Sequence, residues 1–270
     1  MKTLLRYPLL LVHGLGFRDD MTLSYWGRIP QALEAFGCQV FLSGQDGGGN
    51  AERNGAQVAR RINEILKLTG AEKVNIIAHS KGGLDSRYAI SSLNMADKVA
   101  SLTTLATPHH GSKSIDMIMK LPDPVIRFAG ACADGWFRLI GDQAPSTHQI
   151  LRSFTTEEAS LFNAQNPDRE GVFYQSYAFV MDKPLADPLL WLSNLVVQRI
   201  EGENDGLLPP DAVKWGNFRG VYRSSQRRGI SHLDQIDLRR RPMSKSSPEG
   251  VLDILDIYRD IVKELAEKGF

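Results

Sequence analysis

One strand-length apolar run that leads directly into a tight turn constrains the fold more than any other feature of the sequence. Residues 74–78 (Val-Asn-Ile-Ile-Ala) are nearly continuous in apolar character, which is typical of a strand covered on both faces. The run ends at His79-Ser80-Lys81-Gly82-Gly83, and residues 84–90 have a composition that suits a helix. We therefore expect a central parallel strand, a sharp turn and a helix at this point of the chain.

Strand-length apolar runs alternate with helix-period segments along the rest of the chain. Further strands are expected at residues 9–12, 39–42, 101–105, 173–180 and 220–223. Such alternation predicts the α/β class, with a mostly parallel central sheet and helices on both of its faces. No linker or repeat divides the sequence, so we expect a single domain over residues 1–270.

Two helices and one insertion stand out in this pattern. Apolar residues at helical spacing run from Val58 to Leu66, ahead of Gly70. A second stripe covers residues 251–265, and we expect its helix to open at Ser247-Pro248-Glu249 and to close at Gly269. Residues 112–150 are rich in apolar side chains but interrupted by proline and glycine, and we interpret them as a helical cap inserted into the sheet domain.

Composition excludes several classes of function. The 32 Lys and Arg residues nearly balance the 31 Asp and Glu residues, for a net charge of +1, so we expect no nucleic-acid partner. No apolar run reaches the roughly 18 to 20 residues of a membrane span. The run at residues 9–12 continues into His13-Gly14 with no small-residue cleavage site. We therefore expect no signal peptide, and either a cytoplasmic protein or one secreted without a cleaved signal.

The turn around Ser80 has the spacing of a nucleophile elbow. Such a turn needs small residues two positions before and two positions after the serine, because neighbouring backbones approach closely there. Ala78 and Gly82 meet this need, although the strict motif has glycine at the first position. The alternative is an accidental triplet of small residues at the start of a helix. On the first interpretation Ser80 is the catalytic nucleophile.

A serine hydroxyl needs a base, and the base needs an orienting acid. Of the six histidines, His232 lies in a loop before the last predicted helix, where the order serine, acid, histidine places the base. Asp205 lies upstream in an Asn-Asp-Gly turn and is our candidate acid, with Asp211 and Glu203 as weaker alternatives. The other interpretations are a surface histidine and a turn without chemistry.

An oxyanion hole requires two backbone N–H groups. One follows the nucleophile and the other comes from the loop after an early strand, which points to Lys81 and Leu15. The glycines on either side of Leu15 would let the backbone approach a substrate closely.

In this order the motifs resemble those of bacterial true lipases of the α/β-hydrolase fold, in the compact group that includes secreted triacylglycerol lipases. The resemblance rests on residues 8–17, 78–83, 107–112, 204–207 and 232–234. It implies hydrolysis of acylglycerol esters with no cofactor for the chemistry. It also implies a movable lid over the acyl pocket.

The resemblance further implies a structural Ca²⁺ ion that ties the base loop to an earlier segment. Asp187 and Asp234 fit the positions of its two carboxylate ligands, and backbone carbonyls of the following turn would complete an oxygen shell. The alternative is that both are ordinary surface carboxylates. The cationic run at residues 239–241 is unusual at this place.

The lid of the family corresponds to residues 112–140. Ile115, Ile118 and Met119 would share one helical face, and the apolar residues among 136–140 would form a second cluster. A lid of this kind would cover the acyl pocket and meet an oil or membrane interface when open. The same residues could instead pack a permanent cap onto the core.

We therefore expect a serine carboxylic-ester hydrolase, specifically a lipase that acts through an acyl-enzyme. A soluble short-chain carboxylesterase or an acyltransferase with the same triad is the first alternative. A non-catalytic lipid-binding module of the same fold is the second.

Overall fold

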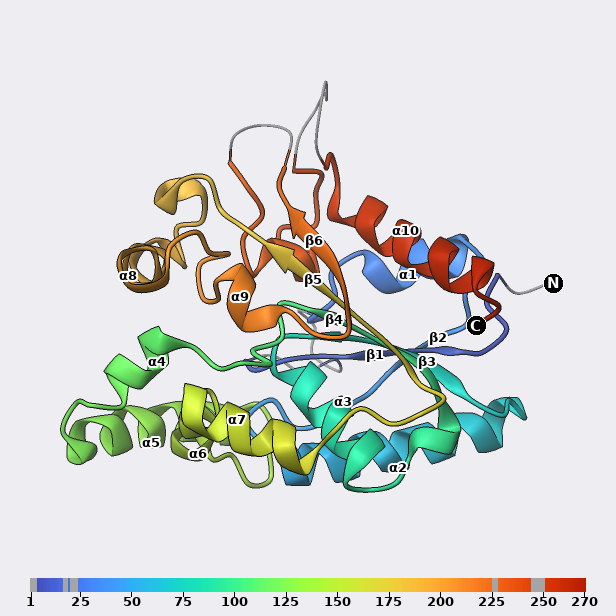
Figure 1. The fold of residues 1–270 in the computed structure, drawn as a ribbon, viewed down its shortest axis with the longest axis horizontal. Helices are drawn as coiled ribbons and strands as arrows, with labels where there is room; N and C mark the ends of the chain where they lie inside the picture. Colours follow the sequence, from blue (N-terminus) through green and yellow to red (C-terminus); the bar gives the residue numbers. More distant parts are fainter. Residues whose placement is uncertain (1–3, 17–18, 20–23, 225–227, 244–250) are drawn as a thin grey trace.

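A single six-stranded sheet organises the molecule. The computed structural model describes residues 4–16, 19, 24–224, 228–243 and 251–270. The strands pair in parallel in the order β2-β1-β3-β4-β5-β6 (Figure 1). Their bounds are β1 (Leu9–Val12), β2 (Val40–Leu42), β3 (Val74–His79), β4 (Val99–Leu105), β5 (Phe173–Phe179) and β6 (Asn217–Tyr222). The α/β class expected from the alternating pattern is confirmed.

The strand order places a crossover between β1 and β3. β2 pairs with one edge of β1. The chain then crosses over, so that β3 pairs with the other edge of β1. In parallel sheets a ligand site lies beyond the carboxyl ends of the strands at such a reversal. The turns after β1 and β3 are the ones that carry Leu15 and Ser80, so the topology brings both candidate residues to this edge.

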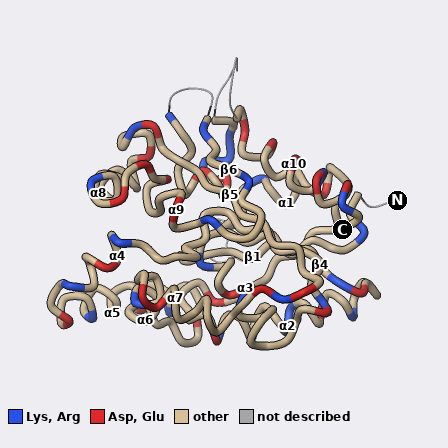
Figure 2. The backbone as a smooth tube through the Cα atoms, in the orientation of Figure 1, with Lys and Arg blue, Asp and Glu red and all other residues tan. Residues whose placement is uncertain are grey.

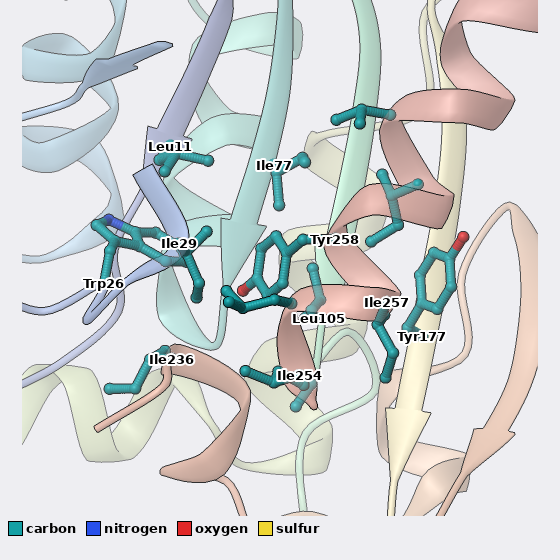
Figure 3. Packing of buried hydrophobic residues seen from close by; sticks show 14 of the residues in the cluster. Leu11, Trp26, Ile29, Ile77, Leu105, Tyr177, Ile236, Ile254, Ile257 and Tyr258 are labelled. Carbon is teal, nitrogen blue, oxygen red and sulfur yellow. The ribbon is translucent and has the colours of Figure 1, made fainter. Parts of the chain in front are cut away.

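Helices cover both faces of the sheet. The helices α1 (Ile29–Ala35) and α10 (Ile254–Glu267) lie on one face, and α2 (Ala51–Thr69) and α3 (Lys81–Ser91) on the other (Figure 1). Alternate residues of β1 serve the two layers, because Leu9 and Leu11 belong to one core cluster and Leu10 and Val12 to the other. Figure 3 shows Tyr258 of α10 packed among Trp26, Leu11 and Ile77 on the first face.

The last helix begins later than the sequence predicts. Val251 does not start it, since Val251 N donates to Arg223 O at 3.2 Å in an isolated bridge. The helix begins instead at Ile254, where Asp253 and Asp256 form a capping box. The predicted opening at Ser247-Pro248-Glu249 lies outside the described residues, as does Phe17 at the end of the predicted oxyanion loop.

The expected cap region is helical. It contains α4 (Lys113–Ile118), α5 (Asp123–Leu139) and α6 (Thr147–Ser153), and α7 (Thr156–Gln165) follows. Gly130 does not interrupt α5, and it allows close packing because a Cβ there would lie 3.3 Å from the amide nitrogen of His148 on α6. These helices gather beyond the carboxyl ends of the strands, below α8 in the view of Figure 1.

The second half of the chain returns to this end of the sheet with shorter elements. They are η2 (Pro184–Ala186), α8 (Trp191–Glu201), α9 (Pro210–Val213) and η3 (Asp234–Ile236), whereas η1 (Ala96–Lys98) precedes β4. β6 begins at Asn217, three residues before the predicted start. Residues of both charge signs occur on the helices of both layers that cover the sheet (Figure 2). None of the helices in the described part of the chain combines the length and hydropathy needed to cross a bilayer.

Candidate active site

Ser80 occupies a strained turn between β3 and α3. Its backbone has φ 53° and ψ −131°, a conformation that L residues rarely adopt. Two hydrogen bonds hold it there, from Ser80 N to Leu105 O at 2.9 Å and from Thr107 Oγ1 to Ser80 O at 2.7 Å. The side chain is thereby presented at the carboxyl edge of the sheet.

The glycines after Ser80 are required by close approach of other chain segments. A Cβ on Gly82 would lie 2.4 Å from the carbonyl oxygen of His13, and a Cβ on Gly83 would lie 2.2 Å from Thr107 Oγ1. Gly14 is constrained in the same way, since its Cβ would lie 2.8 Å from the Cβ of Ser80. The turn after β1 and the turn after β3 therefore pack directly against each other, as a nucleophile elbow demands.

Asp205 lies on a turn that is built from buried polar groups. Asn204 Oδ1 accepts a hydrogen bond from Gly206 N at 2.8 Å, and Gly206 adopts φ 107°. Asp205 Oδ1 accepts from the amides of Leu207 at 3.0 Å and Leu208 at 2.9 Å. The carboxylate is buried, and these bonds fix its orientation toward the base loop.

His232 is hydrogen-bonded to this carboxylate. His232 Nδ1 lies 2.7 Å from Asp205 Oδ2, and His232 N donates to Asp205 O at 2.7 Å. An ionised carboxylate only accepts, so Nδ1 carries the proton and Nε2 is left as an acceptor. Asp205 Oδ2 also accepts from Gln235 Nε2 at 2.8 Å. Gln235 was not among the site residues predicted from the sequence, because no motif includes it.

Two buried aromatic side chains, His79 and Tyr25, lie beside His232. The rings of His79 and His232 have centroids 4.5 Å apart, and Tyr25 Oη lies 2.7 Å from His79 Nδ1. Burial, and then the neighbouring His232, lower the pKa of His79 well below its ordinary value. His79 therefore stays neutral, and no second positive charge opposes protonation of His232. Tyr25 is 54 residues from His79 in sequence, and no local signal could have identified it.

Ser80, His232 and Leu15 line one cavity of about 250 Å³. Most of its other lining residues are apolar, among them Ile115, Leu151, Phe154, Leu207, Leu208 and Leu233. The lining combines residues of the sheet edge, the base loop and the cap. Lys81 is the first residue of α3, so its amide belongs to the helix turn that has no intrahelical acceptor.

A comparison with protein families agrees with this geometry. Residues 7–178 match the family described as alpha/beta hydrolase fold, which is more than half of the chain. The chain belongs to the α/β hydrolase family.

Individual relatives of this α/β hydrolase carry lipase names. It is 31% identical to a triacylglycerol lipase of Vibrio cholerae, over 86% of this chain and 80% of the relative. It is 29% identical to triacylglycerol lipase 2 of Saccharomyces cerevisiae, over 94% of this chain and 77% of that protein. The crystal structure of the Bacillus licheniformis lipase BlEst2 in mature form superposes with a TM-score of 0.67 at 23% identity, covering 86% of this chain and 87% of the other. That last similarity concerns the fold.

The two carboxylates predicted to bind Ca²⁺ lie close together in this α/β hydrolase. Ser231 Oγ donates to Asp187 Oδ2 at 2.7 Å, and Ser231 N donates to Asp234 Oδ2 at 3.0 Å. They are buried, so the alternative of ordinary surface carboxylates is wrong. Two guanidinium groups lie against them, however, and the described residues contain no group of three or more His, Cys, Asp or Glu side chains able to hold a metal ion. The donor set does not fit Ca²⁺.

Proposed function

We propose that this α/β hydrolase is a lipase that cleaves acylglycerol esters through an acyl-enzyme on Ser80. The observation that carries the proposal is the shared cavity, in which a strained serine and a carboxylate-bound histidine face the same apolar space. The names of the similar proteins support the choice of acylglycerols as substrate class. The small excess of positive charge and the apolar lining agree with a neutral ester substrate.

The first chemical step forms the acyl-enzyme. Ser80 Oγ attacks the ester carbonyl while His232 Nε2 accepts the hydroxyl proton, and Asp205 stabilises the resulting imidazolium. The amides of Leu15 and Lys81 stabilise the negative oxygen of the tetrahedral intermediate. Collapse of that intermediate breaks the bond to the alkoxy oxygen, which leaves as the alcohol with the proton held by His232. Water, deprotonated by His232, then attacks the acyl group and releases the carboxylic acid and Ser80.

The size of the cavity supports a movement of the cap when long acyl chains bind. Typical sites for small ligands occupy about 300 to 1,000 Å³, and this cavity has only about 250 Å³. Ile115 of α4, Leu151 of α6 and Phe154 form its cap side. Displacement of these helices would enlarge the cavity and open it to solvent, as lids do in other enzymes.

The outer surface of the cap and of its neighbour α8 would then meet lipid. Phe128 and Leu139 of α5 are 73% and 83% exposed, and Leu185 of η2 is 80% exposed. Further apolar side chains on or beside these helices are also more than half exposed, namely Met117, Leu121, Val125, Trp136, Leu189 and Leu192. Apolar surface of this extent on a monomer marks an interaction site. We propose an oil or membrane interface as the partner.

Replacement of Ser80 by alanine tests the nucleophile. Because the hydroxyl forms the covalent bond, Ser80→Ala should lower kcat by about 10⁵-fold or more while the melting temperature stays near the wild-type value. Hydrolysis of p-nitrophenyl esters and labelling by a fluorophosphonate probe are the measurements. Ser193→Ala, on the outside of α8, is the matched control. If Ser80→Ala retains esterase activity, or is still labelled by the probe, the proposal is contradicted.

The same assay separates the lipase from its alternatives. A lipase gains activity on emulsified long-chain esters, whereas a short-chain carboxylesterase prefers dispersed short acyl chains. Product analysis in the presence of an alcohol reveals an acyltransferase. A non-catalytic lipid-binding module would show neither turnover nor labelling of Ser80.

A further inference from the structure

We propose that Arg228 and Arg239 take the place of a structural calcium ion in this protein. Their guanidinium groups neutralise Asp187 and Asp234 and fasten the loop that carries His232, so that folding and activity require no calcium. The fastening of the loop is independent of the proposed ester hydrolysis, but its consequence for activity rests on the proposed function.

Arg228 engages both oxygens of one carboxylate. Its Nη2 lies 3.0 Å from Asp234 Oδ1 and 2.7 Å from Asp234 Oδ2. The same nitrogen lies 3.4 Å from the carbonyl oxygen of Ala186. Arg228 thus joins the start of the base loop to its end and to the η2 segment.

Arg239 bridges the two carboxylates from the other side. Its Nη2 lies 3.4 Å from Asp187 Oδ2, and its Nε lies 3.6 Å from Asp234 Oδ1. Nη2 also donates to Ala186 O at 2.9 Å. Two cationic side chains therefore converge on two buried carboxylates and one carbonyl oxygen, the kinds of oxygen that Ca²⁺ prefers.

The oxygens at this place are already used. Asp187 Oδ1 accepts from Leu189 N at 3.0 Å, and Asp187 Oδ2 accepts from Ser231 Oγ at 2.7 Å. In the turn expected to supply carbonyl ligands, Asp234 O accepts from Asp237 N and Gln235 O accepts from Tyr258 Oη. A divalent ion placed between the carboxylates would meet two fixed positive charges, and it would displace donors that are already in place.

The bridge acts on His232 through a short and tightly packed loop. Gly229 follows Arg228, and a Cβ on Gly229 would lie 2.3 Å from the carbonyl oxygen of Val180. Ile230 N donates to Val180 O at 2.7 Å, so the loop backbone is joined to the end of β5. Asp234 is two residues after His232. The loop is thus held on both sides of His232, and loss of Arg228 and Arg239 would weaken the attachment on the side of Asp234.

Thermal unfolding with and without calcium tests the proposal. The wild-type melting temperature should be the same in millimolar CaCl₂ and in EDTA. The double variant Arg228→Ser/Arg239→Ser leaves two buried carboxylates without cations, and its melting temperature should fall by on the order of 10 °C. Millimolar CaCl₂ should then raise it by on the order of 5 °C, because the freed oxygens form a weak calcium site.

Arg223→Ser is the matched control. Arg223 also pairs with two carboxylates, Asp182 at 2.8 Å and Glu203 at 2.6 Å, but its side chain is 43% exposed. Its loss should shift the melting temperature by no more than about 2 °C, with no response to calcium. If the double variant does not fold, the single variants Arg228→Ser and Arg239→Ser are measured instead. Each should show a smaller fall in melting temperature than expected for the double variant, and a smaller rise when CaCl₂ is added.

Two results would overturn the proposal. One is a wild-type melting temperature that rises in calcium and falls in EDTA. The other is a double or single variant that keeps the wild-type melting temperature. Neither measurement uses a substrate, so failure here is distinct from failure of the proposed hydrolysis. Hydrolysis of a short-chain p-nitrophenyl ester, whose acid product stays dissolved with calcium, should proceed at the same wild-type rate in EDTA and in CaCl₂.

Discussion

The base side and the cap side of the cavity are held by different forces. On the base side, buried polar and charged groups dominate: Asp205, His232, Asp234 and Asp237 are all buried and hydrogen-bonded. On the cap side, α4, α5 and α6 contribute apolar groups to the cavity or expose them to solvent. The groups proposed for proton transfer therefore lie in a stiff, hydrogen-bonded frame, whereas the cap, which we propose to control access, exposes large apolar side chains.

Arg28, at the start of α1, extends the stiff frame along the face of the sheet that α1 and α10 cover. Its guanidinium group binds Asp237 at 2.7 Å and Asp253 at 2.9 Å, and its amide donates to Asp237 Oδ2 at 2.8 Å. Asp237 ends η3, the turn that begins two residues after His232. The base loop is therefore anchored by arginines on two sides. In the cap, the ion pairs of Asp123 and Arg152 involve side chains that are more exposed.

Removal of one donor to Asp205 tests the stiff side and should have the larger effect on activity. Gln235→Leu keeps the side-chain size but deletes the hydrogen bond to Asp205 Oδ2. We expect kcat to fall about 10- to 100-fold with little change in KM, since a hydrogen bond to a charged group is lost.

Gln198→Leu on the outside of α8 is the control for this change. It should leave both kcat and KM as in the wild type. A normal kcat for Gln235→Leu would show that Asp205 functions without the hydrogen bond from Gln235. The proposed difference between a stiff base side and the cap would then be wrong.

Polar substitutions on the cap test the other side. Phe128→Ser and Leu139→Ser remove exposed apolar surface, so activity on emulsified long-chain triacylglycerols should fall by about 3- to 10-fold. Activity on dispersed short-chain esters should change less than about twofold. Leu68→Ser is the matched control, because Leu68 on α2 is 74% exposed and distant in sequence from the cap. Equal losses on both substrate types would contradict a lipid-contact role.

Acid should weaken the fold through two buried histidines, His79 and His109. Burial, and then the charge of Arg87, lower the pKa of His109 well below its ordinary value, and His79 is depressed in the same direction. The unfolded chain takes up protons below about pH 6.5 whereas the folded chain does not, so stability falls as pH falls, by about 1.4 kcal/mol per histidine and pH unit.

Melting temperatures measured between pH 7.5 and pH 5.5 check this expectation. His109→Gln should remove about half of the slope that the two histidines cause. The exposed His110 provides the control, and His110→Gln should leave the slope unchanged. A melting temperature that does not fall with pH would show that neither buried histidine resists protonation.

The strands and the chemical motifs could be predicted because their signals are local. Residues 74–78 are apolar because β3 is covered on both faces, and the six strands expected from such runs are all present. The small residues around Ser80 and the Asn-Asp-Gly turn at Asp205 reflect backbone approach within a few residues. The structure brings these residues together with His232 at one cavity, and their catalytic roles remain our proposal.

The supporting groups could not be predicted because their partners are distant in sequence. Gln235 has no periodic or motif signal, and its function depends on a carboxylate 30 residues away. Arg239 belongs to a cationic run, and a sequence pattern does not show whether a guanidinium group points to solvent or to a buried carboxylate. The sequence likewise does not show which apolar residues of the cap are buried. Phe137 is buried whereas Phe128, on the same helix, is exposed.

The anchoring by Arg28 affects how the molecule matures during synthesis. Its partners Asp237 and Asp253 follow it by 209 and 225 residues. A nascent chain completes the serine turn early, but the histidine loop cannot be secured until the last segment leaves the ribosome and joins α1. Contacts of such long sequence separation form late in folding. In a partly translated chain, the loop that carries His232, our proposed general base, therefore lacks its anchor to the start of α1.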